Sequence, residues 1–263
     1  MKLAIIGYGA IAAYAAQKLR ELDGVELEYV LCREGREDVA IQKTGAAQAV
    51  TSFDQIENDI DLVIECGGHE AFRQHVSGIL SAGVDVISVS SGVMATEEDA
   101  KQLEDITSQS GAILQFATGA IGAMDALNAA SVGGLTSVTY IGRKRPAGWK
   151  GSRAEEVMDL DNLSEATIHF EGTARDAANL YPKNANVAAT IAMSGIGMTG
   201  TQVKLYADPT VQKNIHEIEV EGTFGRFTFR IEGSSLPDNP KSSALTAMSV
   251  VEAVAKRQRH ILS

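Results

Sequence analysis

Leu3-Ala4-Ile5-Ile6-Gly7-Tyr8-Gly9-Ala10-Ile11-Ala12 is the stretch that decides the fold of this 263-residue chain. Four apolar residues, typical of a buried strand, lead into a turn with the spacing G-x-G-x-x-A. The first glycine allows a tight turn, the second lets a pyrophosphate approach the backbone, and the small third residue lets helix and strand pack closely. The next helix begins with free N–H groups that favour phosphate. We therefore predict that a dinucleotide binds at Gly7, Gly9, Ala10 and Ile11; the alternative is a plain structural turn.

Short apolar runs alternate with helical patterns up to about residue 118. Strands are expected at 3–6, 27–31, 61–65, 84–89 and 112–116, with helices at 10–22, 71–82 and 96–111. Strands and helices in this alternation predict a parallel sheet with helices on both faces. Together with the glycine turn, they predict an α/β dinucleotide-binding domain of the Rossmann type over residues 1–118.

The pattern changes after about Gly119. Apolar and polar residues now alternate at 135–142, 166–171, 201–207, 215–220 and 226–231, with helical stretches at 122–131, 173–180 and 186–192. A two-residue period is typical of a half-exposed antiparallel sheet. We predict a second, α+β domain over residues 119–241, built on an open, largely antiparallel sheet, and a last helix from Ser242 to Arg259.

The composition excludes several classes of protein. A net charge of −11 argues against a protein that coats nucleic acid or an anionic membrane. The first 118 residues hold 8 of the 23 basic and 19 of the 34 acidic residues, so the whole imbalance lies there. No run approaches the ~18–20 apolar residues of a membrane span, and the glycine turn comes too soon for a signal peptide. Two cysteines without metal-like spacing indicate a reduced, cytoplasmic chain and no metal site.

The end of the second predicted strand bears on the choice of cofactor. An acid at this position would bind the ribose hydroxyls of NAD, but the chain has Arg33 there. An arginine can contact a 2'-phosphate or stack on adenine. We therefore expect that NADP is accepted as well as NAD; the alternative is a solvated surface arginine.

Three phrases, together with the glycine turn, resemble the L-aspartate dehydrogenase family. Thr118-Gly119-Ala120-Ile121-Gly122-Ala123 is similar to its S-G-A-I-G-G segment. The stretch FEGTARDAA (170–178) resembles its F-x-G-x-A-x-x-A segment, and YPKNANVAA (181–189) resembles its [FY]-P-x-N-x-N-V-A-A segment. The stretch NPKSS (239–243) is similar to its N-P-K-[TS]-S segment. The departures are small: Ala12, Thr118 and Ala123 stand where the family has glycine, serine and glycine.

The resemblance implies a specific activity. Family members oxidise L-aspartate to iminoaspartate with NAD or NADP, and the imine is hydrolysed to oxaloacetate and ammonia or feeds quinolinate and NAD biosynthesis. The family's cofactor contacts fall on Ala120 and Asn186, and its catalytic histidine falls on His216. The resemblance also implies a homodimer or larger homo-oligomer packed through the open sheet, and a last helix, 242–263, that returns to the first domain.

The residues themselves leave the site partly open. Oxidation of an amino acid requires that the α-amine lose a proton, and histidine suits this because its unperturbed pKa is about 6.5. Besides His216, His69 is a candidate because it follows Gly67-Gly68 at the carboxyl end of an expected strand, whereas His169 is expected to be structural.

A dicarboxylic amino acid also needs groups that hold its carboxylates. Lys241 and Ser242, at the expected start of the last helix, are candidates. Five basic residues between Arg143 and Arg153 form either a solvated loop or a positive rim at the substrate's entrance.

Two alternatives to an aspartate dehydrogenase remain at this stage. One is a related two-domain reductase of the dihydrodipicolinate reductase or homoserine dehydrogenase type, which would carry different residues in the segments around Asn186 and His216. The other is a sensor that binds the dinucleotide without catalysis.

Overall fold

The computed structural model of the protein describes residues 1–57, 59–182, 186–237 and 239–261, with the backbone alone at Pro240 and Lys241. The chain forms two compact units. The first comprises Met1–Val93, Glu97–Ala117 and Leu236–Ser263, and the second comprises Met94–Thr96 and Thr118–Ser235.

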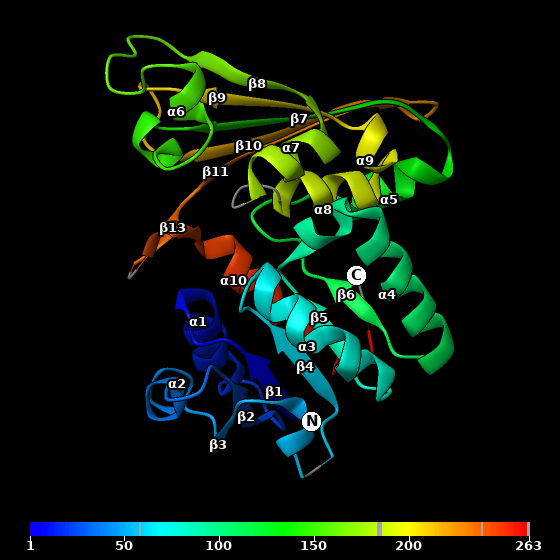
Figure 1. Ribbon diagram of the computed structural model, residues 1–263. Coiled ribbons are helices and arrows are strands. Elements are labelled where there is room, and N and C mark those ends of the chain that lie inside the picture. Colours follow the sequence, from blue (N-terminus) through cyan, green and yellow to red (C-terminus); the bar gives the residue numbers. More distant parts are fainter. Residues whose placement is uncertain (58, 183–185, 238, 262–263) are drawn as a thin grey trace. The chain divides into compact units, whose positions relative to one another are not determined.

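A six-stranded parallel sheet forms the centre of the first unit (Figure 1). Its strands are β1 (Lys2–Ile6), β2 (Glu26–Leu31), β3 (Gln48–Val50), β4 (Leu62–Glu65), β5 (Asp85–Ser88) and β6 (Leu114–Phe116). They lie in the order β3-β2-β1-β4-β5-β6, which is the strand order of the Rossmann fold. The prediction of this fold for the first part is therefore confirmed, and the strand order reverses between β1 and β4, where such sheets bind ligands.

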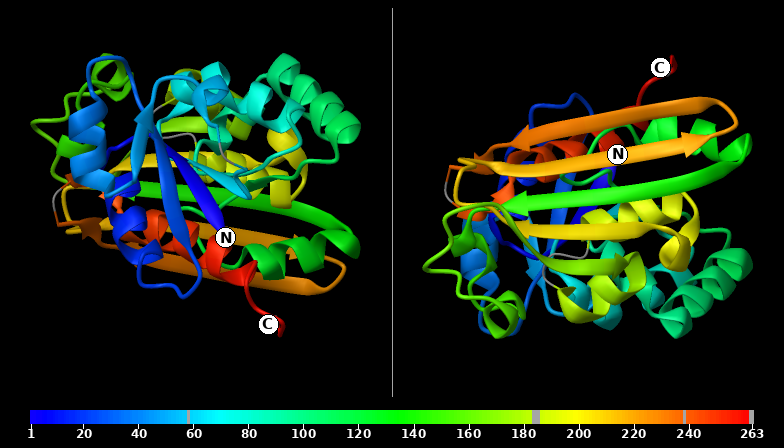
Figure 2. Two further views of the ribbon diagram at one scale, coloured as in Figure 1. Left: turned by 90° about the horizontal axis from the view of Figure 1, so that it is seen from below. Right: turned by 90° about the horizontal axis from the view of Figure 1, so that it is seen from above.

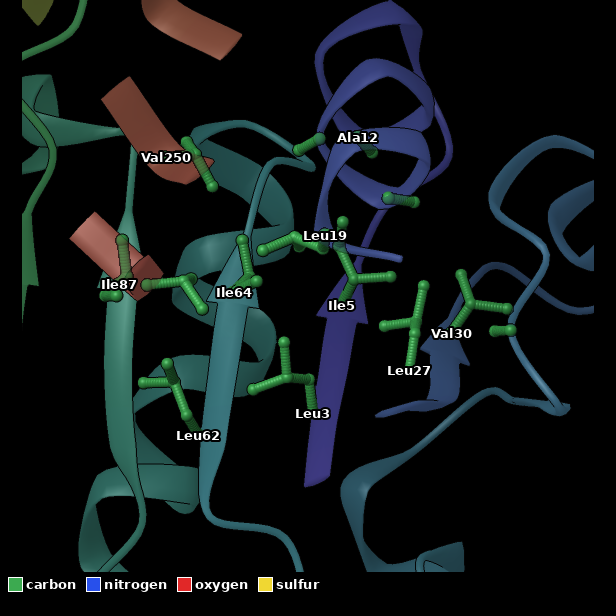
Figure 3. Packing of buried hydrophobic residues seen from close by; sticks show 14 of the residues in the cluster. Leu3, Ile5, Ala12, Leu19, Leu27, Val30, Leu62, Ile64, Ile87 and Val250 are labelled. Carbon is green, nitrogen blue, oxygen red and sulfur yellow. The ribbon is translucent and has the colours of Figure 1, made fainter. Parts of the chain in front are cut away.

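Helices cover both faces of this sheet. They are α1 (Ala10–Leu19), α2 (Glu37–Thr44), α3 (His69–Ser81), α4 (Glu97–Ser110) and α10 (Ala244–Lys256). Leu3 and Ile5 of β1 pack with Leu19 of α1 and Val250 of α10 in one core cluster (Figure 3). The small side chains Ala12, Ala15 and Ala16 of α1 are fully buried, so this helix lies close to the sheet and fixes the glycine turn that precedes it.

Several elements of the first unit differ from the sequence prediction. Helix α2 and strand β3 were not predicted, because only Ala40 and Thr44 of α2 are buried and β3 has three residues. The last helix begins at Ala244 and not at Ser242, since residues Asn239–Ser243 form β13, paired with β12 (Ser235–Leu236). Placing Lys241 and Ser242 at a helix start was therefore wrong. The pairing of β13 with β12 explains the difference, because it keeps the backbone extended up to Ser243.

The second unit contains a five-stranded mixed sheet (Figure 2). Its strands are β7 (Leu135–Lys144), β8 (Thr167–Thr173), β9 (Gln202–Ala207), β10 (Asn214–Gly222) and β11 (Gly225–Gly233), in the order β11-β10-β7-β9-β8. All neighbours are antiparallel except β7 and β9. The prediction of an α+β unit on a largely antiparallel sheet is confirmed.

One face of this second sheet is buried beneath helices. The α-helices of this unit are α5 (Met124–Val132), α6 (Ala154–Val157), α7 (Ala174–Leu180), α8 (Asn186–Ser194) and α9 (Gly197–Gly200). The described residues of the two units also form the 3-10 turns η1 (Phe53–Gln55), η2 (Ser91–Ala95) and η3 (Pro146–Trp149). Val138 and Tyr140 of β7 and Ile218 and Val220 of β10 belong to the core under these helices. Because side chains alternate between the faces of a strand, His216 lies on the same inner face as Ile218.

Candidate active site

The glycine turn of the first unit is built for close approach of a ligand to the backbone. Gly7 has φ 95°, and a Cβ atom there would lie 2.8 Å from the Cα of Gly67, so only glycine fits. Its N–H donates to the carbonyl of Leu31 at 2.9 Å. A Cβ at Gly9 would meet no atom within 4 Å, and α1 begins at the next residue. The turn therefore leaves open space in front of a helix N-terminus, which fits the pyrophosphate of a dinucleotide.

A buried carboxylate supports the neighbouring turn. Oε1 of Glu65, at the end of β4, accepts hydrogen bonds from the N–H groups of Gly67 (2.7 Å) and Gly68 (2.8 Å), and Oε2 accepts one from Oγ of Ser88 at 2.5 Å. Burial raises the pKa of Glu65 above its ordinary value. Sequence reasoning missed this residue, although an acid that ends the apolar run Leu62-Val63-Ile64 was a usable signal. Glu65 holds in place the turn against which Gly7 packs.

The other predicted site residues of the first unit are His69, Arg33, Lys241 and Ser242. His69 is the first residue of α3 and directly follows Gly68. Arg33 is exposed in the loop after β2, and Arg36, which the sequence reasoning did not single out, is exposed in the same loop. Oγ of Ser242 accepts a hydrogen bond from the Asn239 amide at 3.0 Å, whereas the side chain of Lys241 lies outside the described part of the chain.

In the second unit, His216 is paired with a tyrosine from the neighbouring strand. Its side chain is 5% exposed, and its Nδ1 lies 2.8 Å from Oη of Tyr140. Gly142 makes this pair possible, because a Cβ there would lie 2.8 Å from the same Oη. The absence of a side chain at position 142 therefore leaves room for the phenol to reach the imidazole.

Burial keeps both partners of this pair neutral. Desolvation, together with the charge of Lys144, lowers the pKa of His216 to about 3, and desolvation raises the pKa of Tyr140 well above its ordinary value. A neutral imidazole that donates its Nδ1 proton to Tyr140 has Nε2 free as a proton acceptor. The pair can therefore act as a general base through Nε2.

A second histidine of this unit lies in an aromatic cluster. The ring of His169 is 4.3 Å from that of Trp149, and its Nδ1 is 3.1 Å from Oη of Tyr181. Burial, together with the charge of Lys144, lowers the pKa of His169 to about 4. Lys144 thus lies near both histidines of the second unit.

The other two predicted site residues of this unit, Ala120 and Asn186, are next to residues of its hydrophobic core. Ala120 is 7% exposed and follows Gly119, whose φ is 70°. Asn186 is the first residue of α8. Their neighbours Ile121 and Ala188 belong to one core cluster with Ile218, which lies near His216 in β10. The structure thus brings Ala120, Asn186 and His216 into one unit, and the glycine turn, Arg33 and His69 into the other.

Two kinds of feature are missing from the described part of the chain. Its histidine, cysteine and acidic residues form no group of three or more that could hold a metal ion. None of the helices described is both long and apolar enough to cross a membrane.

Comparison with known proteins identifies the family. Residues 125–257 match the family model "Aspartate dehydrogenase, C-terminal", and residues 7–117 match the model "Homoserine dehydrogenase, NAD binding domain". The chain is 49% identical over 257 residues to an L-aspartate dehydrogenase of Ruegeria pomeroyi, covering 98% of this chain and 92% of the relative. The chain belongs to the aspartate dehydrogenase family. The resemblance seen in the sequence is thereby confirmed.

Further relatives agree with this membership. An L-aspartate dehydrogenase of Ralstonia pickettii is 44% identical, with 98% of this chain and 97% of the relative covered. The crystal structure of an aspartate dehydrogenase from Thermotoga maritima is 28% identical with a TM-score of 0.81, covering 100% of this chain and 99% of that one. An archaeal homoserine dehydrogenase in complex with NADPH has a TM-score of 0.59 at 12% identity, over 100% of this chain and 98% of that one, and therefore shares the fold alone.

The two units contribute differently to this identification. The first is a nicotinamide-dinucleotide-binding domain, a type that other dehydrogenases share. Most of the second lies within residues 125–257, which match the aspartate dehydrogenase model and also include α10 of the first unit. The second unit therefore separates this family from the homoserine dehydrogenase alternative.

Proposed function

We propose that this member of the aspartate dehydrogenase family oxidises L-aspartate to iminoaspartate with NAD or NADP. The observation that carries the proposal is the neutral imidazole of His216, held by Tyr140 in the unit that matches the aspartate dehydrogenase model. The imine would then be hydrolysed to oxaloacetate and ammonia or be consumed in quinolinate and NAD biosynthesis.

The first unit supplies the groups that would bind the cofactor. Its pyrophosphate would be held by the turn at Gly7 and Gly9 and by the N–H groups of Ala10 and Ile11 at the start of α1, because a Cβ at Gly9 would face open space. The family resemblance adds Ala120 and Asn186 as contacts. When bound, the nicotinamide accepts a hydride from the α-carbon of the substrate.

Arg33 bears on the choice between the two dinucleotides. We propose that its exposed guanidinium contacts the 2'-phosphate of NADP, so that this cofactor is used alongside NAD. Recognition of the pyrophosphate by backbone N–H groups also explains how a unit with a strongly negative net charge can hold an anionic cofactor.

His216 would act on the amine of the substrate. Nε2 takes a proton from the α-ammonium group, and the lone pair freed on nitrogen then assists loss of the α-hydrogen as hydride. The deprotonated amine becomes the imine nitrogen of the product. The pKa of His216 is lowered by desolvation and by the charge of Lys144, and a substrate's negative charge close to the imidazole would raise it by offsetting the second effect.

A panel of amino acids tests the proposed activity. The protein is incubated with NAD or NADP and with L-aspartate, L-glutamate, L-alanine or L-homoserine, and the absorbance of the reduced cofactor is followed. We expect turnover with L-aspartate alone. Turnover of L-homoserine would support the related dehydrogenase, and cofactor binding without turnover of any amino acid would support the sensor.

We further propose that the protein is a cytoplasmic homodimer or larger homo-oligomer. The second sheet ends in the edge strands β8 and β11, and edge strands carry backbone groups that a partner can cover. Both cysteines, Cys32 and Cys66, are free thiols, which agrees with a reducing compartment. Light scattering coupled to size exclusion measures the mass in solution, and a monomer would contradict this proposal.

A further inference from the structure

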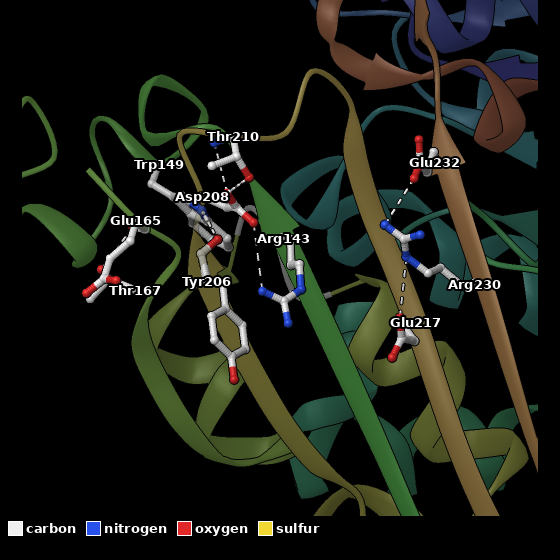
Figure 4. Close-up of polar contacts among 10 residues, drawn as sticks. All are labelled: Arg143, Trp149, Glu165, Thr167, Tyr206, Asp208, Thr210, Glu217, Arg230 and Glu232. Carbon is white, nitrogen blue, oxygen red and sulfur yellow. Dashed lines mark hydrogen bonds and ion pairs between the residues drawn. The ribbon is translucent and has the colours of Figure 1, made fainter. Parts of the chain in front are cut away.

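The basic stretch from Arg143 to Arg153 is divided by the structure into different environments. The guanidinium of Arg143 lies 4.1 Å from the ring centre of Tyr206 and 3.8 Å from Oδ2 of Asp208 (Figure 4). Lys150 forms an ion pair with Asp161 at 2.6 Å, with both side chains largely exposed. Arg153 faces Glu156 at 3.8 Å, and Arg145 is exposed. These four residues fit a solvated surface.

Lys144 differs from them because it lies on the inner face of the sheet. In the pairing of β7 with β10, Gly142 lies opposite His216. Lys144 is two residues further along β7, so its side chain leaves the same face as that of His216. Such diagonal neighbours are roughly 7–8 Å apart, within reach of a long side chain.

The surroundings of Lys144 are partly desolvated and contain both histidines of the second unit. Its Nζ lies 4.8 Å from the ring centre of Trp149, which in turn packs against His169. Burial lowers the pKa of Lys144 to about 8, and the charge of this lysine lowers the pKa of His216 and of His169. A cation therefore lies beside the imidazole that is proposed to receive the proton.

We propose that Lys144 binds one carboxylate of the dicarboxylic substrate beside His216, an inference that rests on the proposed function. The ammonium group donates hydrogen bonds to the carboxylate, and the two charges offset each other. Desolvation and the charge of Lys144 both make His216 a poor proton acceptor, and the second of these effects is offset when substrate is bound. The proton on the α-amine can pass to Nε2, with one N–H bond broken and one formed, while the carboxylate stays on the lysine.

Binding of two simple carboxylic acids tests this role without turnover. Calorimetry compares succinate, which has two carboxylates, with propionate, which has one, on the full protein saturated with NADH. In the wild type we expect succinate to bind more tightly than propionate. In Lys144→Met we expect succinate to bind roughly 10- to 100-fold more weakly, the loss expected for a hydrogen bond between charged groups, and the two acids to bind alike.

Matched variants separate this role from a structural one. Lys150→Met removes an exposed lysine of the same basic stretch and should leave succinate binding unchanged. Lys144→Arg keeps the positive charge and should restore much of the affinity that Lys144→Met loses. The Kd of NADH should stay at its wild-type value in all three variants, and KM for L-aspartate should rise in Lys144→Met in parallel with the Kd of succinate.

A measurement on the wild type keeps the proposal falsifiable if Lys144→Met does not fold. Above pH 8, succinate binding should weaken by about tenfold per pH unit as Lys144 loses its proton. The histidines and tyrosines around it do not titrate in this range, because the pKa values of His216 and His169 lie at about 3 and 4, and burial raises the pKa values of Tyr140 and Tyr181. Binding that does not change with pH in this range would overturn the inference.

The results also distinguish this inference from the proposed function. If the wild type oxidises L-aspartate but Lys144→Met binds succinate as tightly as the wild type, the role of Lys144 is wrong and the function stands. If the wild type neither oxidises L-aspartate nor binds succinate, both the proposed function and the role of Lys144 are wrong.

Discussion

Oη of Tyr140 and Nδ1 of His216 lie 2.8 Å apart in the interior of the second unit, on neighbouring antiparallel strands. In the strand pairing Tyr140 lies opposite Ile218, and His216 lies opposite Gly142. The phenol therefore reaches diagonally across a position that has no side chain. The orientation of the proposed base thus depends on a residue 76 positions away in the sequence.

Removing the hydroxyl should weaken catalysis without affecting the cofactor. In Tyr140→Phe the imidazole keeps its packing but loses the partner of Nδ1, and we expect kcat for L-aspartate to fall by roughly tenfold, the worth of one such hydrogen bond. Steady-state rates measure this, and the Kd of NADH, from its fluorescence, serves as the control. A wild-type kcat in the variant would show that Tyr140 does not position His216.

Glu65 should stabilise the first unit through its acceptor oxygens. In Glu65→Ala the hydroxyl of the fully buried Ser88 and the N–H groups of Gly67 and Gly68 lose their acceptor, and we expect a loss of roughly 1–3 kcal/mol in the free energy of unfolding. Glu65→Gln keeps one acceptor oxygen and should lose less. Urea denaturation measures both, and NADH should bind more weakly to the alanine variant. Equal stability of the two variants would contradict this account.

Ala123 carries backbone strain that the family pattern avoids. Its φ of 62° is the one positive value among the non-glycine residues that the structure describes, and the family has glycine at this position. A non-glycine residue in the left-handed region costs about 1–2 kcal/mol. Glycine removes this cost, but it also increases the conformational entropy of the unfolded chain, which offsets part of the gain in stability. We expect Ala123→Gly to raise the free energy of unfolding by about 0.5–1 kcal/mol; an unchanged or lower value would contradict the strain.

The depressed pKa of His216 should make stability depend on pH. Below about pH 6.5 the unfolded chain binds a proton on this histidine, whereas the folded protein does not until about pH 3. Unfolding is therefore favoured as the pH falls through this window, by roughly 1.4 kcal/mol per pH unit for one group. In His216→Asn the slope of unfolding free energy between pH 6 and 4.5 should be shallower by about this amount. An identical slope would show that the folded protein also protonates His216.

The sequence predicted those features that local patterns determine. The turn at Gly7 and Gly9 was found because the conformations it requires are properties of single residues, and the two-residue period around Ile215-His216-Glu217-Ile218 predicted a half-buried strand. The assignment of His216, Ala120 and Asn186 came from family resemblance and stays a prediction.

The remaining features depend on which strands pair, and periodicity does not fix strand pairing. Tyr140 was not singled out in the sequence, and Lys144 was noted only as one of five basic residues between Arg143 and Arg153. Only the pairing of β7 with β10 places the two residues beside His216. Similarly, the support that Glu65 gives to the turn next to Gly7 follows from β1 lying beside β4. Lys241 and Ser242 were misplaced because the pairing of β12 with β13 was not visible in the sequence.

The measurement that tests the central claim most directly is the initial rate of reduced-cofactor formation from L-aspartate in the wild type and in His216→Ala. We predict that the wild type turns over L-aspartate, and that the variant binds NADH normally but has a kcat lower by roughly 10²- to 10⁴-fold, the usual contribution of general acid–base catalysis. A wild-type rate in His216→Ala, or no oxidation of L-aspartate by the wild type with either NAD or NADP, would contradict it.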